Sequence, residues 1–327
     1  MSDNCVWSIG SAVLGILTRY EVFMHISDLQ TADLPALLAL CETSLPLDRF
    51  TLPLLRRRVL EEPERNAAYQ LLAWDGDQLV GAMLGASRSF GVGRAGWIRL
   101  FAVHPDYRRQ GIASQLLRML EERMVDDGIR IIHVGNSAPN YFWPGLDVRY
   151  TAAYCFLERH GFQRQGEAVN MCMDLGARDW ETHMEEQRLA KQGVQIRRLR
   201  EEDRESFRSW LESRWSPAWT REGMEAFDNQ PISAFVAVQN GRIRAFAAYN
   251  VTMFENSFGP MGTEEELRGL GIGRVLLYRC LQDMKALGHS CAEAGWVGPI
   301  AFYSRVADAW IHRVFWWMHK QVGRDSR

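Results

Sequence analysis

The sequence predicts an α/β (α+β) protein made of two similar domains, each a mixed, mostly antiparallel sheet flanked by helices. Two observations predict this fold class. The loop RRQGIA at 108–113 returns as RGLGIG at 268–273, and each copy lies between an apolar stretch and a run with helical periodicity. The segments around the two loops also follow one another in the same order. Both observations indicate a tandem duplication of one domain.

The matching segments begin with HISDLQTAD at 25–33 and QIRRLREED at 195–203. Next come LLAWDGDQLVG and FVAVQNGRIRA, which read as hairpins because Asp75-Gly76-Asp77 and Asn240-Gly241 are turn signals. The helical runs that open at the two loops both stop at a glycine, Gly128 or Gly288. We expect domains at 22–175 and 194–327, joined by a short linking helix within 176–193. We expect residues 1–21 to be an N-terminal extension, and Met24 is a candidate for the natural start.

Each glycine loop is a candidate anion site. Gly111, Gly271 and Gly273 have no Cβ, so the backbone turns tightly and a phosphate oxygen can approach it closely. The N–H groups and the dipole at the start of the following helix also favour an anion. A single glycine turn of this kind is more often an ordinary strand-to-helix turn. Two copies in matching surroundings indicate a nucleotide-containing cofactor instead.

The order of strands, helices and hairpin, with the loop V-x-P-x-Y-R-R-x-G-I-A at 103–113, resembles the GNAT superfamily of N-acetyltransferases twice over. The resemblance covers about 22–175 and 194–320. It implies acetyl-coenzyme A (acetyl-CoA) as cofactor and a primary amine as acceptor. Residues that it implies for cofactor binding are Phe101, Ala102, Val103, Arg108, Arg109, Gln110, Gly111, Ile112 and Ala113 in the first half, and Met261, Gly262, Thr263, Arg268, Gly269, Leu270, Gly271, Ile272 and Gly273 in the second. The arginines among them are alternatively solvated loop residues.

The resemblance also implies a tyrosine four residues before the glycine of a Gly-Phe pair, as the acid that protonates the departing thiolate. In the first half that position is Leu157. Tyr154, one turn earlier, is either a substitute acid or a packing residue. In the second half Tyr303 stands at the matching place. We therefore expect the C-terminal domain to be catalytic, while the first domain binds acetyl-CoA without turnover or builds part of the acceptor pocket.

Two carboxylates are candidate bases for deprotonating the amine, Glu293 on the predicted fifth strand and Glu255 before the fourth. Each is alternatively a structural or surface carboxylate. His133 matches Glu293 in the first half and is expected to be a buried, hydrogen-bonded histidine. Backbone N–H groups near 261–263 are expected to stabilise the oxyanion.

The loop NSAPNYFWPGLDVRY at 136–150 has no counterpart in the second half. Its aromatic content suits either a ligand wall or a plug between the domains. The candidate acceptor residues are Tyr141, Phe142, Trp143, Asp147 and Trp296. The aromatic tail at 309–320 is expected to be the last strand of the second sheet, with dimerisation through it as the alternative.

Composition excludes several other classes. The formal net charge of −2 argues against a nucleic-acid partner. The apolar stretch at 6–17 is too short to span a bilayer. The six cysteines form no C-x-x-C pair, so we expect neither disulfides nor a metal site. These expectations fit a cytoplasmic location. The predicted function is acetyl transfer to a small-molecule amine, such as an amino sugar, an aminoglycoside-like compound or an amino-acid conjugate. The alternatives are a catalytically silent acetyl-CoA sensor or partner-binding module, and a protein N-acetyltransferase.

Overall fold

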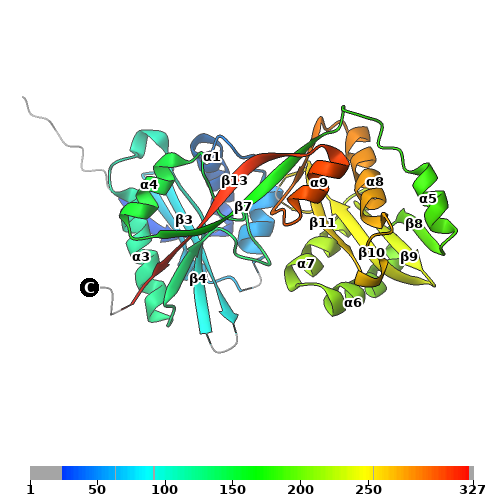
Figure 1. The fold of residues 1–327 in the computed structure, drawn as a ribbon. Helices are drawn as coiled ribbons and strands as arrows, with labels where there is room; N and C mark the ends of the chain where they lie inside the picture. Colours follow the sequence, from blue (N-terminus) through cyan, green and yellow to red (C-terminus); the bar gives the residue numbers. More distant parts are fainter. Residues whose placement is uncertain (1–23, 63, 91–92, 253, 324–327) are drawn as a thin grey trace, which may run out of the picture.

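The protein forms two lobes that are joined by a pair of long strands (Figure 1). The computed structural model describes residues 24–62, 64–90, 93–252 and 254–323, so the expected extension at 1–21 lies outside it. The first half contains β1 (Met24–Asp28), α1 (Leu34–Ser44), α2 (Leu52–Leu55), a short π-helical turn η2 (Arg56–Leu60), β2 (Gln70–Asp75), β3 (Gln78–Phe90), β4 (Gly93–Val103), α3 (Ile112–Asp126), β5 (Ile131–Val134), β6 (Leu146–Asp147), α4 (Thr151–Arg159) and β7 (Gln163–Asp174).

The second half repeats this plan after a linking helix. It contains α5 (His183–Ala190), β8 (Val194–Arg198), α6 (Arg204–Arg214), α7 (Pro217–Glu225), β9 (Ala234–Gln239), β10 (Arg242–Tyr249), β11 (Ser257–Thr263), α8 (Ile272–Ala286), β12 (Cys291–Ala294), α9 (Ile300–Ala307) and β13 (Trp310–Gln321). Both predicted hairpins form, as β2–β3 and β9–β10. Asn240 and Gly241 have φ values of 52° and 73°, the left-handed conformation that a tight hairpin turn requires. The α/β fold class and the duplication are confirmed.

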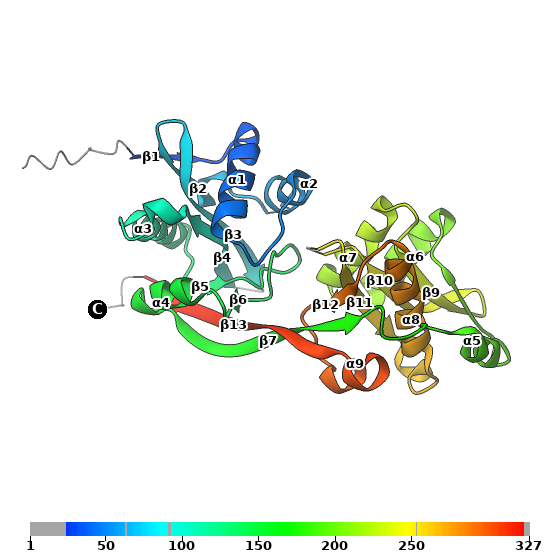
Figure 2. The same cartoon turned by 90° about the horizontal axis from the view of Figure 1, so that it is seen from above.

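The two halves exchange strands. One continuous sheet runs β1-β2-β3-β4-β5-β13-β7-β12-β11-β10-β9-β8. Strand β7 pairs with β13 over most of its length and reaches β12 of the second half with its last residues, Met171 to Asp174. Strand β13 leaves the second lobe and pairs with β5 of the first, with Met318 opposite Val134. The crossing pair is seen from above in Figure 2.

The position of β13 corrects one expectation. The tail at 309–320 is a strand, but it does not simply close the second sheet, because its C-terminal half lies in the first lobe beside β5. Without β13 the inner edge of β5 would be unpaired, and a sheet edge is a site of unwanted pairing. The exchange therefore makes each lobe depend on the other for a complete sheet.

In the first lobe, helices cover both faces of the sheet. Leu116 and Leu120 of α3 and Leu157 of α4 belong to one buried cluster, while Leu37 of α1 and Leu55 of α2 belong to a second. Any gap between two strands of this sheet therefore faces α3 and α4 on one side and α1 and α2 on the other. Within the described ranges, no helix combines the length and apolar character that crossing a membrane requires.

Candidate cofactor and acceptor site

The site begins where two parallel strands separate. Strands β4 and β5 pair only from Gly96 opposite Ile132 to Ile98 opposite Val134, while β4 continues to Val103 against β3 alone. Between Ile98 and Leu100 the register with β3 shifts, which makes Arg99 the extra residue of a β-bulge. The bulge turns the rest of β4 away from β5 and leaves its backbone groups facing the gap.

The glycine loop connects the end of β4 to α3. Gly111 is the N-cap of α3 with φ +88°, and no side chain caps the helix. The first N–H groups of a helix have no partner within it, so this terminus presents free donors and a positive dipole end. Arg108 donates from Nε to the Val103 carbonyl at 3.2 Å, and Arg268 makes the same 3.2 Å bond to Thr263. In both copies this first arginine braces the loop.

A cavity of about 770 Å³ starts at this loop and runs through the gap between β4 and β5. Helix α4 forms its other wall, and Ser114 of α3 bonds His160 Nε2 across it at 2.9 Å. Ser44 and Leu45, at the end of α1, also line the cavity, and the Ser44 carbonyl accepts a 3.3 Å hydrogen bond from Arg108 of the loop. Because α1 and α4 cover opposite faces of the sheet, the cavity is lined from both faces. The predicted cofactor residues that line it are Phe101, Ala102, Val103, Arg108, Arg109, Gly111, Ile112 and Ala113. Gln110 instead bonds the Asp106 carbonyl with its side chain.

The second copy of the loop has the same backbone but different surroundings. Gly271 has φ +84° and caps α8 as Gly111 caps α3. However, Phe302 Cζ and Met261 Cε lie 3.8 and 3.9 Å from where a Cβ on Gly273 would be. On β11, a Cβ on Gly262 would lie 2.6 Å from the Trp215 ring. Phe302 and Met261 thus lie near this copy of the loop, as Phe156 and Phe101 do in the first lobe, while Trp215 packs directly on Gly262 of β11.

Two further contacts lie at the second copy of the loop. Tyr278 on α8 donates to the Val306 carbonyl of α9 at 2.6 Å, which packs the two helices together. Arg188 of α5 donates to the Leu270 carbonyl at 2.5 Å, so a side chain lies against the loop itself. The remaining predicted residues of this copy are Arg268, Gly269, Ile272 and Thr263, which lie in the loop, at the start of α8 and at the end of β11.

The predicted catalytic residues of the second half do not come together. Tyr303 is buried in the core, with ring centroids 6.0 Å from Phe258 and 5.2 Å from Phe302, and burial raises its pKa. Glu293 accepts a 2.6 Å hydrogen bond from Asn170, and Glu255 lies exposed on the loop before β11. Tyr303 therefore lies in the core cluster of the second lobe, and its assignment as the catalytic acid stays a prediction.

In the first half Tyr154 also misses the cavity, since its hydroxyl donates to Glu158 at 2.8 Å and its ring packs on Trp316 at 4.8 Å. Two tyrosines line the cavity, Tyr107, whose hydroxyl donates to Asp75 at 2.8 Å, and Tyr150 at the start of α4. Tyr150 lies on the side of the long loop. Its hydroxyl donates to Asp48 Oδ2 at 2.9 Å and accepts from the Leu47 N–H at 3.2 Å. Sequence reasoning missed it because counting back from Gly161 leads to the middle of the helix.

The long loop 136–150 serves both purposes that the sequence left open. Trp143 and Asp147 line the cavity. In contrast, Phe142 is buried in the core, and Tyr141 packs edge-on against Trp296 of the second lobe with ring centroids 5.3 Å apart. Of the five candidate acceptor residues, two thus line the cavity and the other three join the lobes or fill the core; their role in acceptor binding stays a prediction.

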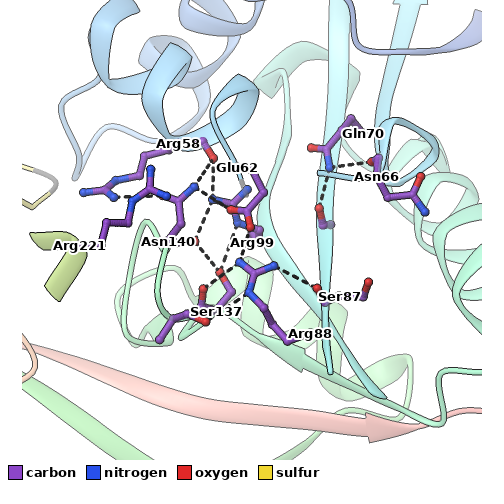
Figure 3. Close-up of polar contacts among 12 residues, drawn as sticks. Arg58, Glu62, Asn66, Gln70, Ser87, Arg88, Arg99, Ser137, Asn140 and Arg221 are labelled. Carbon is purple, nitrogen blue, oxygen red and sulfur yellow. Dashed lines mark hydrogen bonds and ion pairs between the residues drawn. The ribbon is translucent and has the colours of Figure 1, made fainter. Parts of the chain in front are cut away.

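A buried charged network forms one wall beside the cavity (Figure 3). Glu62 lies 2.5 Å from Arg88 and 3.2 Å from Arg99, and all three side chains are nearly or completely buried. Arg99 also donates to the carbonyls of Arg58 and Asn140 at 2.6 and 2.9 Å. Burial lowers the pKa of Arg99 to about 10, against the opposing effect of Glu62. This network holds η2, the bulge of β4 and the long loop together.

His133 lies beside the gap, where its ring stacks on Trp97 with centroids 5.4 Å apart. Burial and the neighbouring His319 lower its pKa, so the neutral form predominates at pH 7. His133 and Glu293 occupy corresponding positions, opposite Trp97 and Ser257 in their parallel pairs. The alignment of the two halves predicted from the sequence is therefore the one that the strands adopt at this point.

Comparison with known proteins places this geometry in a family. The model of the acetyltransferase (GNAT) family matches residues 35–142 and again 198–305. The chain belongs to this family. The two matches make it a tandem GNAT protein, and the family indicates an acetyltransferase that uses an acyl-coenzyme A. No curated protein matches the sequence.

Solved structures share the fold at low identity. A fungal multi-domain GH3 β-N-acetylglucosaminidase with a GCN5-related glucosamine N-acetyltransferase region is 18% identical, with a TM-score of 0.71 over 91% of this chain, which spans only 38% of that protein. A tandem GNAT protein from the clavulanic acid biosynthesis pathway is 17% identical, with a TM-score of 0.66 over 93% of this chain and 100% of the other. A GCN5-related N-acetyltransferase from Sphaerobacter thermophilus is 17% identical, with a TM-score of 0.62 over 92% and 97%.

Proposed function

We propose that this tandem GNAT protein transfers the acetyl group of acetyl-CoA to the primary amine of a small molecule, and that the N-terminal lobe carries the reaction. The observation that supports the lobe assignment is the cavity of about 770 Å³ that joins the uncapped start of α3 to the far face of the sheet. In the second lobe the Trp215 ring packs on Gly262 of β11, at the strand that corresponds to β4. The second lobe then has a supporting role.

The residues of the cavity suit acetyl-CoA. The free N–H groups at the start of α3 suit the pyrophosphate, with Arg109 beside them. The gap between β4 and β5 suits the narrow pantetheine chain, because its walls combine apolar side chains such as Ile98 and Phe101 with the backbone groups of β4. Ala113 and Ala153 keep the passage between α3 and α4 open, since both side chains are small.

Acetyl-CoA, when bound, supplies the thioester whose acetyl carbon the amine attacks. Backbone N–H groups of β4 past Arg99 face the gap and are placed to donate to the developing oxyanion. Tyr150 is the proposed proton donor to the departing sulfur. Burial, aided by the charge of Asp48, raises the pKa of Tyr150, so the phenol stays protonated at neutral pH.

The acceptor is proposed to enter from the side of α1, past Trp143 and Asp147. Burial raises the pKa of Asp147, but hydrogen bonds from Arg149 outweigh it, so the net pKa lies below the usual value. Asp147 is therefore ionised at neutral pH, and because Arg149 and Arg313 balance its charge, this wall suits a polar acceptor. An amino sugar is consistent with this polar and aromatic wall, and one structural neighbour is described as a glucosamine N-acetyltransferase region.

A cytoplasmic location is part of the proposal, and the five described cysteines are free thiols.

Calorimetry with acetyl-CoA tests the cofactor, and release of free thiol with a panel of amines tests the reaction. The panel includes glucosamine, an aminoglycoside, spermidine and a peptide with a free N-terminus. We expect one mole of acetyl-CoA per mole of chain, and turnover with a small amine. Binding without turnover would support the sensor, and labelling of the peptide alone would support the protein acetyltransferase. A stoichiometry of two would contradict the assignment of cofactor binding to the N-terminal lobe alone.

A further inference from the structure

Arg313 connects the exchanged strand β13 to the cavity of the first lobe. Its Nη1 lies 2.8 Å from Asp48 Oδ1, and its Nε lies 2.8 Å from Asp147 Oδ2. Arg313 is only 3% exposed, and both carboxylates are buried. Asp48 comes from the loop after α1 and Asp147 from β6, so one guanidinium from the C-terminal end of the chain spans two segments of the N-terminal lobe.

Both carboxylates bind groups that line the cavity. Asp48 accepts from the Trp143 indole at 2.9 Å and from the Tyr150 hydroxyl at 2.9 Å. Asp147 lines the cavity itself and is paired on its outer side with Arg149 at 2.8 Å. The chain of contacts from Arg313 through Asp48 to Tyr150 thus ends at a hydroxyl in the cavity wall.

The charges explain why Arg313 is needed at this position. Two carboxylates that lie close together out of water repel each other, and breaking a buried ion pair leaves an uncompensated charge. Burial on its own would lower the pKa of Arg313, yet Asp48 and Asp147 raise it overall, so the guanidinium remains charged. A single ammonium cannot reproduce two bonds from separate nitrogens of a rigid, planar group.

We infer that Arg313 is a positioning residue for the first lobe: it fixes Asp48, and through Asp48 it orients Tyr150 and Trp143 at the acceptor end of the cavity. The inference rests on the proposed function and deepens it, since it gives the second half of the chain a defined part in the site. The strand exchange then has a functional consequence, because β13 delivers a side chain that the N-terminal lobe alone lacks.

The test compares Arg313→Met and Arg313→Lys with Lys320→Met. Lys320 lies on the same strand and makes a 2.7 Å ion pair with Glu121. It does not line the cavity, so Lys320→Met is a control that removes one ion pair from this strand. We expect both Arg313 variants to bind acetyl-CoA within about threefold of wild type. We expect kcat/KM for the best amine of the panel to fall by about 10²-fold for methionine and about 10-fold for lysine, and Lys320→Met to stay near wild type.

Two further measurements separate positioning from a general structural effect. Added guanidinium ion should restore part of the activity of Arg313→Met, because the space left by the side chain can admit it. In addition, 3-fluorotyrosine incorporated in place of Tyr150 should give one sharp ¹⁹F resonance in the wild-type background, which shifts or broadens with Arg313→Met. This second readout needs no acceptor and remains available if no amine of the panel is acetylated.

The outcomes distinguish this inference from the proposed function. Failure of the wild-type protein to bind acetyl-CoA contradicts the proposed function, while the ¹⁹F resonance still decides the role of Arg313. Folded Arg313→Met and Arg313→Lys proteins with unchanged kcat/KM and an unchanged resonance would overturn the inference. If Arg313→Met does not fold, Arg313→Lys, which keeps the charge, provides the same comparison.

Discussion

The ring of Phe302 lies against Gly273, with Cζ 3.8 Å from the position that a Cβ on this glycine would take. In the first lobe the corresponding residue, Ala113, lines an open cavity. The alignment that matches Tyr303 with Leu157 also matches Phe302 with Phe156, which lines the open cavity and packs on Phe101. The side chain that differs in size is the C-cap of α1 or α6, which is Leu45 beside the cavity and Trp215 against Gly262 of β11.

The two glycine N-caps offer a matched pair of variants. Gly111 and Gly271 have φ values of +88° and +84°, so alanine costs a similar free energy of folding at each, roughly 1–2 kcal/mol. Only Gly111 lines the cavity. We expect Gly111→Ala to weaken acetyl-CoA binding at least about 10-fold, because the added Cβ disturbs the free N–H groups at the start of α3. Calorimetry should find the affinity of Gly271→Ala unchanged, and the reverse pattern would move the cofactor to the second lobe.

The roles of three tyrosines can be compared by removing the hydroxyl group of each one in turn. Tyr150→Phe should lower kcat by about 10²-fold, because the proposed proton donor is lost while the ring remains. Tyr154→Phe and Tyr303→Phe should change kcat by less than about twofold, since neither residue lines the cavity. The measurement is steady-state thiol release at saturating acetyl-CoA. A large loss with Tyr303→Phe alone would restore the assignment made from the sequence.

The network around Glu62 should contribute strongly to stability. Glu62→Gln leaves Arg88 and Arg99 buried without their shared carboxylate, and such a loss typically costs about 3–5 kcal/mol in the free energy of unfolding. Glu167→Gln is the control, since it breaks the exposed 2.7 Å pair with Arg164, which is worth about 0–1 kcal/mol. Denaturant unfolding compares the two. Equal midpoints would mean that the buried network is no more stabilising than a surface pair.

Much of the fold could be predicted from the two repeats, because hairpin turns, capping glycines and helical periodicity are local sequence signals. The loops at Gly111 and Gly271, the β2–β3 and β9–β10 hairpins and the aromatic strand β13 all lie where these signals predict them. The partner of β13 was not predictable in this way. Pairing with β5 in the other lobe is decided by which sheet edge is free, and that depends on the whole topology.

The candidate site was predicted in part for the same reason. Glycine and arginine spacing pointed to the loop at which the cavity starts, and aromatic content pointed to Trp143 and Asp147, which line the cavity. Spacing could not show that Trp215 packs on Gly262 of β11, because this contact arises through tertiary packing. Nor could it connect Arg313 to Asp48, which are separated by most of the chain and meet only after strand exchange.

Glu222 on α7 is buried among Arg58 and Tyr141 of the first lobe, and we expect it to make stability depend on pH. It is 5% exposed, and burial raises its pKa from the usual 4.5 to about 7, while Arg58 and Tyr141 act in the opposite direction and Glu225 reinforces the rise. A carboxyl group whose pKa is higher in the folded than in the unfolded state binds its proton more tightly when folded. Its contribution therefore lowers the free energy of unfolding as pH rises from about 4.5 to about 7, and is constant above that.

Glu222→Gln should remove this dependence, because the amide carries no titrating proton. The shift corresponds to a penalty on the order of 3 kcal/mol, so the variant should gain up to that amount of stability over wild type at pH 8 and little at pH 4.5. The exposed Glu202→Gln is the control, and urea unfolding at pH 5, 6, 7 and 8 gives the difference curve in which other titrating groups cancel. If the difference in the free energy of unfolding between Glu222→Gln and wild type does not change with pH, or increases as the pH falls, Glu222 is ionised in the folded protein and held by Arg58.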